Sequence, residues 1–192
     1  MKTAERHQDG EAGFSLIETM IAMAILATGL LSMAGVFIMG MNHLGSSTAS
    51  LIAREKAREA VESVHTARDN KAIAWCRIRN VGTATGCTDG AAGAFLAGST
   101  SLTTPGADGL VNTADDGAVE ESITPGNDGV LGTADDKKVP LSTYTRQIEI
   151  LDVLMANGQP NPNLRRLRVT IGYRVGTLQR TYQLTTFISA IS

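Results

Sequence analysis

The sequence predicts an α+β fold, in which a long N-terminal helix packs on a small antiparallel β-sheet that carries a Gly/Asp-rich loop insert. Three observations lead to this prediction. Residues 14–41 are apolar and continue into a charged segment, residues 42–70, that keeps a helical pattern. Stretches of residues 143–188 alternate between polar and apolar side chains, as half-buried strands do. A stretch rich in Gly and Asp separates these two parts.

The apolar run is long enough to cross a membrane. Residues 14–41 contain one charge, Glu18, and a spanning helix needs about 20 apolar residues. A cleaved secretory signal would have a shorter apolar core, with its small-residue cut site after that core. Here the small residue Gly13 lies before the run, so that a cut at Gly13 would leave the helix on the mature protein.

Glu18 is the informative residue of this run. A lone carboxylate in hydrocarbon costs at least ~2.5 kcal/mol and is functional by default. No Lys or Arg lies within residues 14–41, so that a new α-amino group on Phe14, from this chain or a neighbour, would be a suitable partner. The alternative is that Glu18 lies near the membrane surface and is hydrated.

The segment from Gly13 to Glu18, GFSLIE, followed by the apolar helix, resembles the cleavage motif of type IV prepilins. The resemblance covers residues 8–70. It implies that prepilin peptidase cuts between Gly13 and Phe14 and N-methylates Phe14. It also implies that Glu18 neutralises the Phe14 amine of an adjacent subunit during assembly. The leader departs from the usual pattern, because Asp9 and Glu11 stand where basic residues are more usual, but acidic residues affect orientation little.

The resemblance also sets the expected organisation. Residues 1–13 are a leader peptide, residues 14–41 a transmembrane and filament-core helix, residues 42–70 its continuation, and residues 71–192 a β head with an acidic insert at 104–136. The helix is anchored in the inner membrane with the head outside the cytoplasm, and the protein then reaches the pilus or cell surface. The implied partners are other pilin subunits, prepilin peptidase, the inner-membrane pilus-assembly machinery and the lipid bilayer.

The helix is expected to continue beyond the membrane. Small apolar residues recur at three- and four-residue steps, which makes one stripe on the helix. These residues are Ala53, Ala57, Ala60, Val61, Val64 and Ala67. Lys56 and Glu59 can form an ion pair on the outer face. The stripe predicts a helix face that packs on the head.

Three late segments, residues 143–155, 164–175 and 178–188, predict a three-stranded antiparallel meander. Residues 157–163 form the loop between the first two strands, and residues 74–79 are a candidate short strand. Three arginines of the middle segment share one face, namely Arg166, Arg168 and Arg174. They can be a solvated outer face or a basic ladder for an anionic partner, and the solvated face is the expectation.

Two cysteines, Cys76 and Cys87, are expected to form a disulfide, since the anchor places them outside the cytoplasm. Closing so short a loop contributes roughly 3 kcal/mol in the chain-entropy account. Two free thiols in a reducing compartment are the alternative.

The insert contains a repeat. Residues 104–116 and 124–136 align without gaps and are identical at nine of thirteen positions. Each copy has Asp-Gly, five residues, and then Asp-Asp, and a tight turn can bring the first aspartate near the last pair. The aspartates in question are Asp108, Asp115, Asp116, Asp128, Asp135 and Asp136. Such oxygen ligands suit Ca²⁺, although the spacing is not that of an EF-hand. The alternative is a pair of flexible, solvated acidic loops.

These features lead to one expected function and two alternatives. The expected function is a structural subunit, a minor pilin of a type IV pilus; the stretch at residues 21–36 resembles minor pilins of the pilus-modification type. The alternatives are a pseudopilin of a type II secretion system and a calcium-dependent surface-binding pilin. No enzyme is expected, because no catalytic triad, zinc spacing or phosphate loop is present in the sequence. The net charge of -2 does not indicate nucleic acid as a partner.

Overall fold

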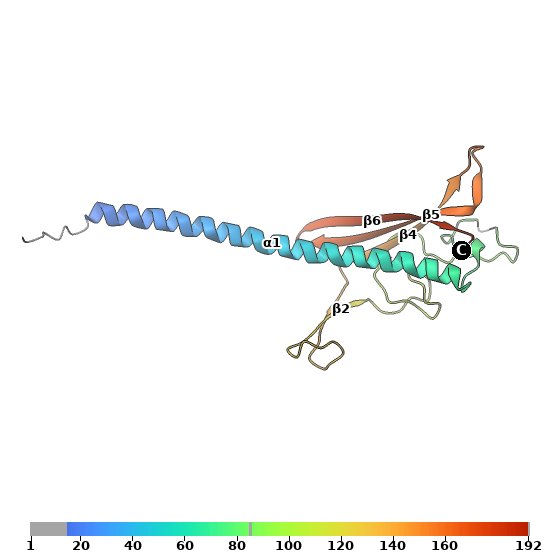
Figure 1. Cartoon of the computed structure of the whole chain (residues 1–192), viewed down its shortest axis with the longest axis horizontal. Helices are drawn as coiled ribbons and strands as arrows, with labels where there is room; N and C mark the ends of the chain where they lie inside the picture. Colours follow the sequence, from blue (N-terminus) through green and yellow to red (C-terminus); the bar gives the residue numbers. More distant parts are fainter. Residues whose placement is uncertain (1–14, 85, 192) are drawn as a thin grey trace, which may run out of the picture. The chain divides into compact units, whose positions relative to one another are not determined.

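A computed structural model describes residues 15–84 and 86–191, without the side chains of residues 42–44. The described chain contains a long helix, a short 3-10 helix and six strands (Figure 1). In order these are α1 (Leu16–Asp69), η1 (Trp75–Arg77), β1 (Thr100–Ser101), β2 (Glu121–Thr124), β3 (Lys137–Pro140), β4 (Thr145–Leu154), β5 (Pro160–Val175) and β6 (Leu178–Ser189). The chain divides into two compact units, one ending at Gly45 and the other Ser46–Ser192, which we call the head. The predicted α+β fold is confirmed.

In the first unit, the helix α1 is apolar and exposed. Its large side chains, from Leu16 to Met41, are all more than half exposed to solvent. By length and composition, α1 is the one helix of the described residues that could cross a membrane. Exposure of so many apolar side chains in water would be costly at about 25 cal/mol per Å², which is consistent with a lipid or protein environment for this part of α1.

In the head, α1 packs through small residues. The predicted stripe is buried: Ala53, Ala57, Ala60 and Val64 have no exposed surface, and Ala67 has almost none. Short side chains allow the helix backbone to come close to its neighbours in the core. The opposite face stays polar, and the predicted Lys56–Glu59 ion pair forms at 2.7 Å.

The head contains a four-stranded antiparallel sheet in the order β1-β4-β5-β6. The strands β4, β5 and β6 are the predicted meander. Along β5, Leu167, Val169 and Ile171 are buried, while Arg166 and Arg168 at the alternate positions are partly exposed. The rings of Tyr144 and Tyr173 stack at the edge of this core, with centroids 6.0 Å apart. The alternation in the sequence therefore reports which face of each strand lies in the core.

Three details differ from the prediction. Residues 160–163, expected in a loop, are the start of β5, because the chain reverses tightly between Met155 and Gln159 with Gly158 at φ 78. Residues 74–79 contain the 3-10 helix η1 instead of a strand. The strand β1 was not predicted, since two residues are too few to show an alternating pattern.

The strands β2 and β3 form a separate two-stranded sheet. They enclose the second repeat, residues 124–136, and pair from Glu121↔Pro140 to Thr124↔Lys137. All four residues of β3 and three of the four in β2 are exposed. We call residues 121–140 the arm; Figure 1 shows it extending from the rest of the head.

Candidate functional site

The predicted cleavage position, between Gly13 and Phe14, lies outside the described residues. The first described residue is Ser15, whose carbonyl oxygen accepts hydrogen bonds from the N–H groups of Glu18 and Thr19 at 3.0 and 3.2 Å. Glu18 therefore lies in the first turn of α1, on an exposed position. An acidic side chain there also interacts favourably with the positive end of the helix dipole.

The two repeats fold into the same loop. In each copy the Asp-Gly turn brings the first aspartate beside a later one, as the sequence predicted. The N–H of Asp108 donates to Oδ2 of Asp115 at 3.3 Å, and the N–H of Asp128 donates to Oδ2 of Asp135 at 3.4 Å. Gly109 and Gly129 both have φ 70, a conformation that favours glycine. Sequence identity at these positions thus corresponds to identical local geometry.

Each loop also places a threonine hydroxyl on the same carboxylate. Thr113 donates to Oδ1 of Asp115 at 2.8 Å, and Thr133 donates to Oδ1 of Asp135 at 2.7 Å. These hydroxyl hydrogen bonds, with further ones from backbone N–H groups, lower the pKa of both aspartates. The carboxylates are therefore held in the charged form inside the loop.

The last aspartate of each repeat differs between the copies. In the first repeat, both side-chain oxygens of Asp116 accept hydrogen bonds: Oδ1 from Thr113, and Oδ2 from the N–H of Asn112 and the hydroxyl of Thr103. In the second repeat, Oδ2 of Asp136 accepts the N–H of Gly132 at 2.6 Å, while Oδ1 is buried and has no hydrogen-bond partner among the described residues.

These loops were the predicted calcium ligands. The described residues contain no group of three or more His, Cys, Asp or Glu side chains arranged to hold a metal ion. Most of the aspartate oxygens accept hydrogen bonds from the loop itself, while Oδ1 of Asp136 is buried and has no hydrogen-bond partner among the described residues. The repeats as they stand form a closed hydrogen-bonded loop, and calcium binding stays a prediction.

The first repeat is built into the head. Leu110 and Val111 are buried in the core, and Asn112 is fully buried with φ 67. The carbonyl oxygen of Asn112 accepts the N–H of Leu96 at 2.8 Å, and its side-chain amide donates to the carbonyl of Leu96 at 3.0 Å. The corresponding residues of the second repeat are exposed.

A buried ion-pair network joins the first repeat to α1 and the sheet. Arg146 of β4 has no exposed surface; it contacts Glu120 at 3.1 Å and Asp116 at 3.7 Å, and donates to the carbonyl of Thr103 at 2.9 Å. Glu120 also contacts Lys56 of α1 at 2.5 Å. A charge removed from water needs such partners, because an unpaired buried ion is strongly destabilising.

The charged groups around Lys56 change its pKa. Burial alone lowers the pKa of a lysine, but the hydrogen bonds and charges of Glu120 and Glu59 outweigh it, so that the pKa of Lys56 stands above its ordinary value. Lys56 thus remains an ammonium group and connects α1 to the end of the segment that enters the arm.

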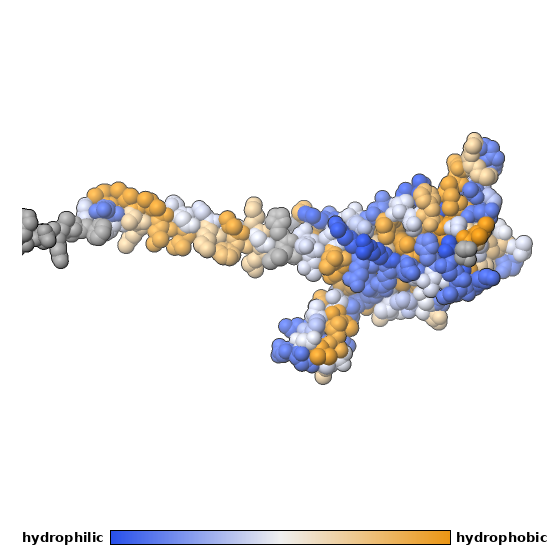
Figure 2. All heavy atoms as spheres, in the orientation of Figure 1, coloured by the Kyte–Doolittle hydropathy of each residue, from blue (hydrophilic) through white to orange (hydrophobic). Residues whose placement is uncertain are grey.

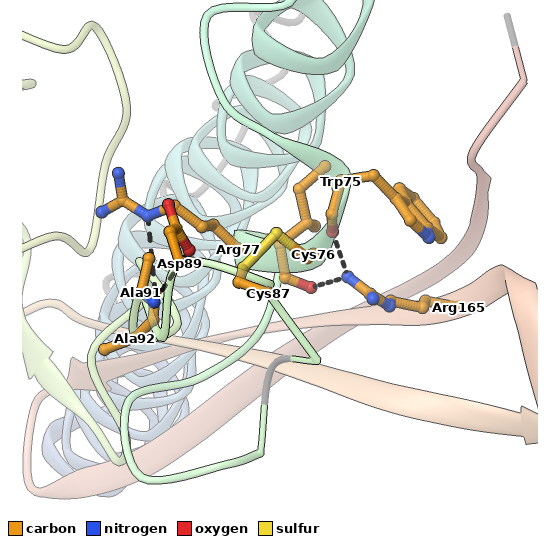
Figure 3. Close-up of a disulfide and its surroundings, with 9 residues drawn as sticks. Trp75, Cys76, Arg77, Cys87, Asp89, Ala91, Ala92 and Arg165 are labelled. Carbon is orange, nitrogen blue, oxygen red and sulfur yellow. Dashed lines mark hydrogen bonds between the residues drawn. A yellow bond between two sulfur atoms is a disulfide. The ribbon is translucent and has the colours of Figure 1, made fainter.

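The two cysteines form a disulfide, Cys76–Cys87, with Cα atoms 5.3 Å apart. Figure 3 shows it beside Arg165, which reaches η1 from β5. The Arg165 side chain donates to the carbonyl oxygens of Trp75 at 2.5 Å and Ile78 at 2.7 Å. The disulfide and this arginine therefore fix the same segment of the chain.

Arg165 is nearly fully buried, and its guanidinium lies 4.2 Å from the centre of the Trp75 ring. Burial, with a smaller effect from the nearby Arg79, lowers the pKa of Arg165 to about 10. The group keeps its charge at neutral pH, since that value is still well above 7. The carboxylate of Asp152 contacts Arg79 at 2.7 Å and balances the local positive charge.

The buried, paired charges of the head were not predicted from the sequence; they are Lys56, Glu120, Arg146 and Arg165. One signal was present: Arg146 has the same parity as the buried Ile148 and Ile150 of β4. Arg165 likewise has the parity of Leu167 in β5. An arginine at an inward position of an alternating strand indicates a buried, paired charge.

A comparison with protein families matched residues 9–34 to the prokaryotic N-terminal methylation motif. Searches of curated proteins and of solved structures gave no match. Residues 9–34 therefore carry the signal shared by type IV pilins and pseudopilins, directly before and within the exposed, apolar part of α1. This N-terminal part of the chain is therefore similar to that of type IV pilins and pseudopilins, and the motif is one of structural subunits.

Proposed function

We propose that the chain is a minor structural subunit of a type IV pilus, matured by prepilin peptidase and assembled through its N-terminal helix. The observation that carries this proposal is the methylation motif at residues 9–34, which continues into the 54-residue helix α1. A cut after Gly13 leaves Phe14 as the new N-terminus, two residues before α1 begins. The exposed apolar half of the helix can then lie in the inner membrane, and afterwards among other helices in a filament.

The head fits a location outside the cytoplasm. The Cys76–Cys87 disulfide is of the kind that persists in an oxidising compartment. A single spanning helix with this head outside the cytoplasm brings the protein to the inner membrane first and to the pilus or cell surface after assembly. Its partners are then prepilin peptidase, the assembly machinery and other pilin subunits.

Mass spectrometry of the mature N-terminus tests the proposal, on protein isolated from native membranes. We expect an N-methylated phenylalanine at Phe14. An intact Met1, or a cut beyond the apolar run, would remove the basis of the proposal.

The pseudopilin of a secretion machine is a second candidate, because pilins and pseudopilins share the motif. Sheared surface filaments separate the two. A minor pilin is expected in the sheared fraction together with pilus subunits, whereas a pseudopilin is expected to remain with the cell envelope.

A surface-binding role is a third candidate, and the exposed arm with its acidic repeat is the observation that favours it. A binding screen of the full chain against surfaces and polymers, with and without Ca²⁺, tests this role. Calcium-dependent binding that is lost when the arm is changed would support an adhesin, and absence of binding in both conditions would count against it.

A further inference from the structure

The two repeats share a loop geometry but differ in the exposure of one apolar pair. In the first repeat this pair is Leu110 and Val111, which are 3% and 0% exposed in the head core. In the second repeat it is Val130 and Leu131, which are 56% and 60% exposed. The first repeat therefore shows what this loop does with its apolar pair, namely insert it into a protein core. The second repeat presents the same element without a partner in its own chain.

The exposed pair belongs to a larger apolar surface on the arm. Ile123 of β2 is also about half exposed. Val139 of β3 is exposed as well but faces the other side of the arm, because it pairs with Ser122 while Ile123 pairs with Lys138. A shallow groove lies between these elements, lined in part by Ile123, Leu131 and Lys138. We call Ile123, Val130 and Leu131 the arm patch; Figure 2 shows hydrophobic side chains on the arm. Apolar side chains gathered on a projecting element indicate a contact surface more than scattered single residues do.

The arm also carries a charge signature. Its carboxylates, Glu121, Asp128, Asp135 and Asp136, outnumber its two lysines. The loop hydrogen bonds hold Asp135 in the charged form by lowering its pKa. A partner that covers the arm patch is therefore expected to combine apolar and positively charged side chains.

One face of the head has this composition. Phe187 of β6 is 55% exposed and lies opposite Arg166 of β5 in the sheet register. Arg168 and Arg174 follow on the same face of β5, at alternate positions whose neighbours are buried. Arg168 is paired with Glu149 at 3.5 Å, while Arg166 and Arg174 have no ion pair among the described residues. We call Arg166, Arg168, Arg174 and Phe187 the outer sheet face.

We propose that the arm patch docks on the outer sheet face of a second copy of this chain. The acidic loop would place Asp128 near Arg166, while Val130 and Leu131 would pack against Phe187, which lies opposite Arg166 in the sheet. The occupant is a second copy because the complementary charge and the exposed ring are both on this molecule.

In the described residues of a single chain, nothing covers the apolar side chains of the arm. The segment that enters the arm starts at Glu120, which is held by Lys56 of α1 and by the inward-facing Arg146. The arm therefore leaves the head from the side of the sheet covered by α1, whereas the outer sheet face is the other side. A contact between different surfaces of two copies is heterologous, and such contacts propagate into open helical assemblies unless they close into a ring. The proposal thus rests on the proposed function and adds a contact between heads to it.

Cross-linking of the purified, full-length mature chain in detergent micelles tests the contact. Leu131→Cys and Phe187→Cys are introduced together, and a short bis-maleimide is added. The described native cysteines are paired in the disulfide, so that the introduced thiols react. We expect a ladder of dimers and longer oligomers from the double variant and none from either single variant. A ladder from Leu131→Cys alone would show two arms in contact with each other, and would overturn the proposed receptor.

Charge variants in the same background sharpen the test. Arg166→Glu is expected to remove most of the ladder, because this change places a like charge opposite the arm. Arg180→Glu is the matched control: it makes the same charge change on β6, at a position that pairs with the buried Tyr173 and thus belongs to the other face. Equal loss in both, or no ladder from the double cysteine variant, would overturn the proposal.

The N-terminus is read by mass spectrometry in the same preparation. A methylated Phe14 without a ladder would overturn the contact and leave the pilin proposal intact. A ladder without methylation would support the contact and overturn maturation as a pilin.

Discussion

At the residue scale, the head depends on charges that lie inside it. Arg146 has no exposed surface, yet it is matched by two carboxylates and a backbone carbonyl. Arg165 is matched by two carbonyl oxygens and an aromatic ring. Both arginines join segments that are far apart in sequence: Arg146 joins the first repeat to the sheet, and Arg165 joins η1 to β5. Their removal should therefore loosen irregular segments more than the strands themselves.

Arg146→Met tests this argument. Loss of the guanidinium leaves Glu120 and Asp116 short of a partner, although Lys56 still contacts Glu120. We expect the free energy of unfolding to fall by about 3 kcal/mol, at the lower end for a broken buried pair. Urea unfolding of the full chain in detergent measures it through the fluorescence of Trp75, the single tryptophan.

Arg168→Met is the matched control for Arg146→Met. Arg168 pairs with Glu149 at 3.5 Å with about a third of each side chain exposed, so that we expect a loss of at most about 1 kcal/mol. Equal losses in the two variants would mean that burial of Arg146 has no special role.

Thr133→Val tests the hydrogen bond that holds Asp135 in the charged form. Without the hydroxyl, we expect the pKa of Asp135 to rise toward its ordinary value, as measured by NMR titration of the carboxyl carbon. Because the folded pKa is lowered, the stabilisation by this carboxylate is complete above the unfolded pKa of about 3.9. It is lost as the pH falls through the lower folded value. Thr124→Val is the control, since the Thr124 hydroxyl donates to the carbonyl of Lys137 and not to an aspartate.

At the element scale, the regular elements could be predicted from the sequence and the irregular ones could not. The helix α1 and the strands β4 to β6 have long periodic patterns that show both their type and their buried face. The strand β1 and the helix η1 are too short to have a pattern. Their place depends on distant contacts, such as Arg146↔Thr100 in the sheet register and Arg165 on η1.

The repeats also have one property that could be predicted from the sequence and one that could not. Nine identical positions predicted two similar loops, and the hydrogen bonds of Asp115 and Asp135 agree. Nothing in the two repeats indicates that one loop is buried and the other exposed, since Leu-Val and Val-Leu are equally apolar. That difference depends on the flanking segments, one of which joins the core while the other forms the arm.

Calcium binding by the repeats can be tested loop by loop. We expect heat in a calorimetric titration of the full chain at Ca²⁺ concentrations of roughly 0.1 to 1 mM, the range of extracellular sites. The second repeat should contribute most, because Oδ1 of Asp136 lacks a partner while both oxygens of Asp116 are engaged. Asp136→Asn should then weaken binding more than Asp116→Asn. No heat at millimolar Ca²⁺ would leave the repeats as metal-free loops.

At the scale of the whole molecule, the chain combines an exposed apolar helical segment with a head that has its own buried core. The head supplies its own core from α1 and the sheet, but the part of α1 before Gly45 has no described partner that covers it. In the proposed function, that part is covered by lipid before assembly and by other helices afterwards. Glu18 is the charge that has to be accommodated in both environments.

Glu18→Gln separates these two stages. The substitution keeps the size and the hydrogen-bonding ability of the side chain and removes the charge. A neutral side chain enters the membrane more easily, so that membrane insertion and the cut after Gly13 should be unchanged. Assembly should fail, because the carboxylate is then absent when a neighbour's Phe14 amine needs a partner. We expect mature protein in the membrane fraction by mass spectrometry and a loss of this chain from sheared filaments. Ser32→Ala is the control, since the Ser32 hydroxyl donates to the Thr28 carbonyl within the helix and should not affect assembly. Incorporation of the Glu18→Gln chain at the wild-type level would show that Glu18 is a hydrated surface residue instead of an assembly residue.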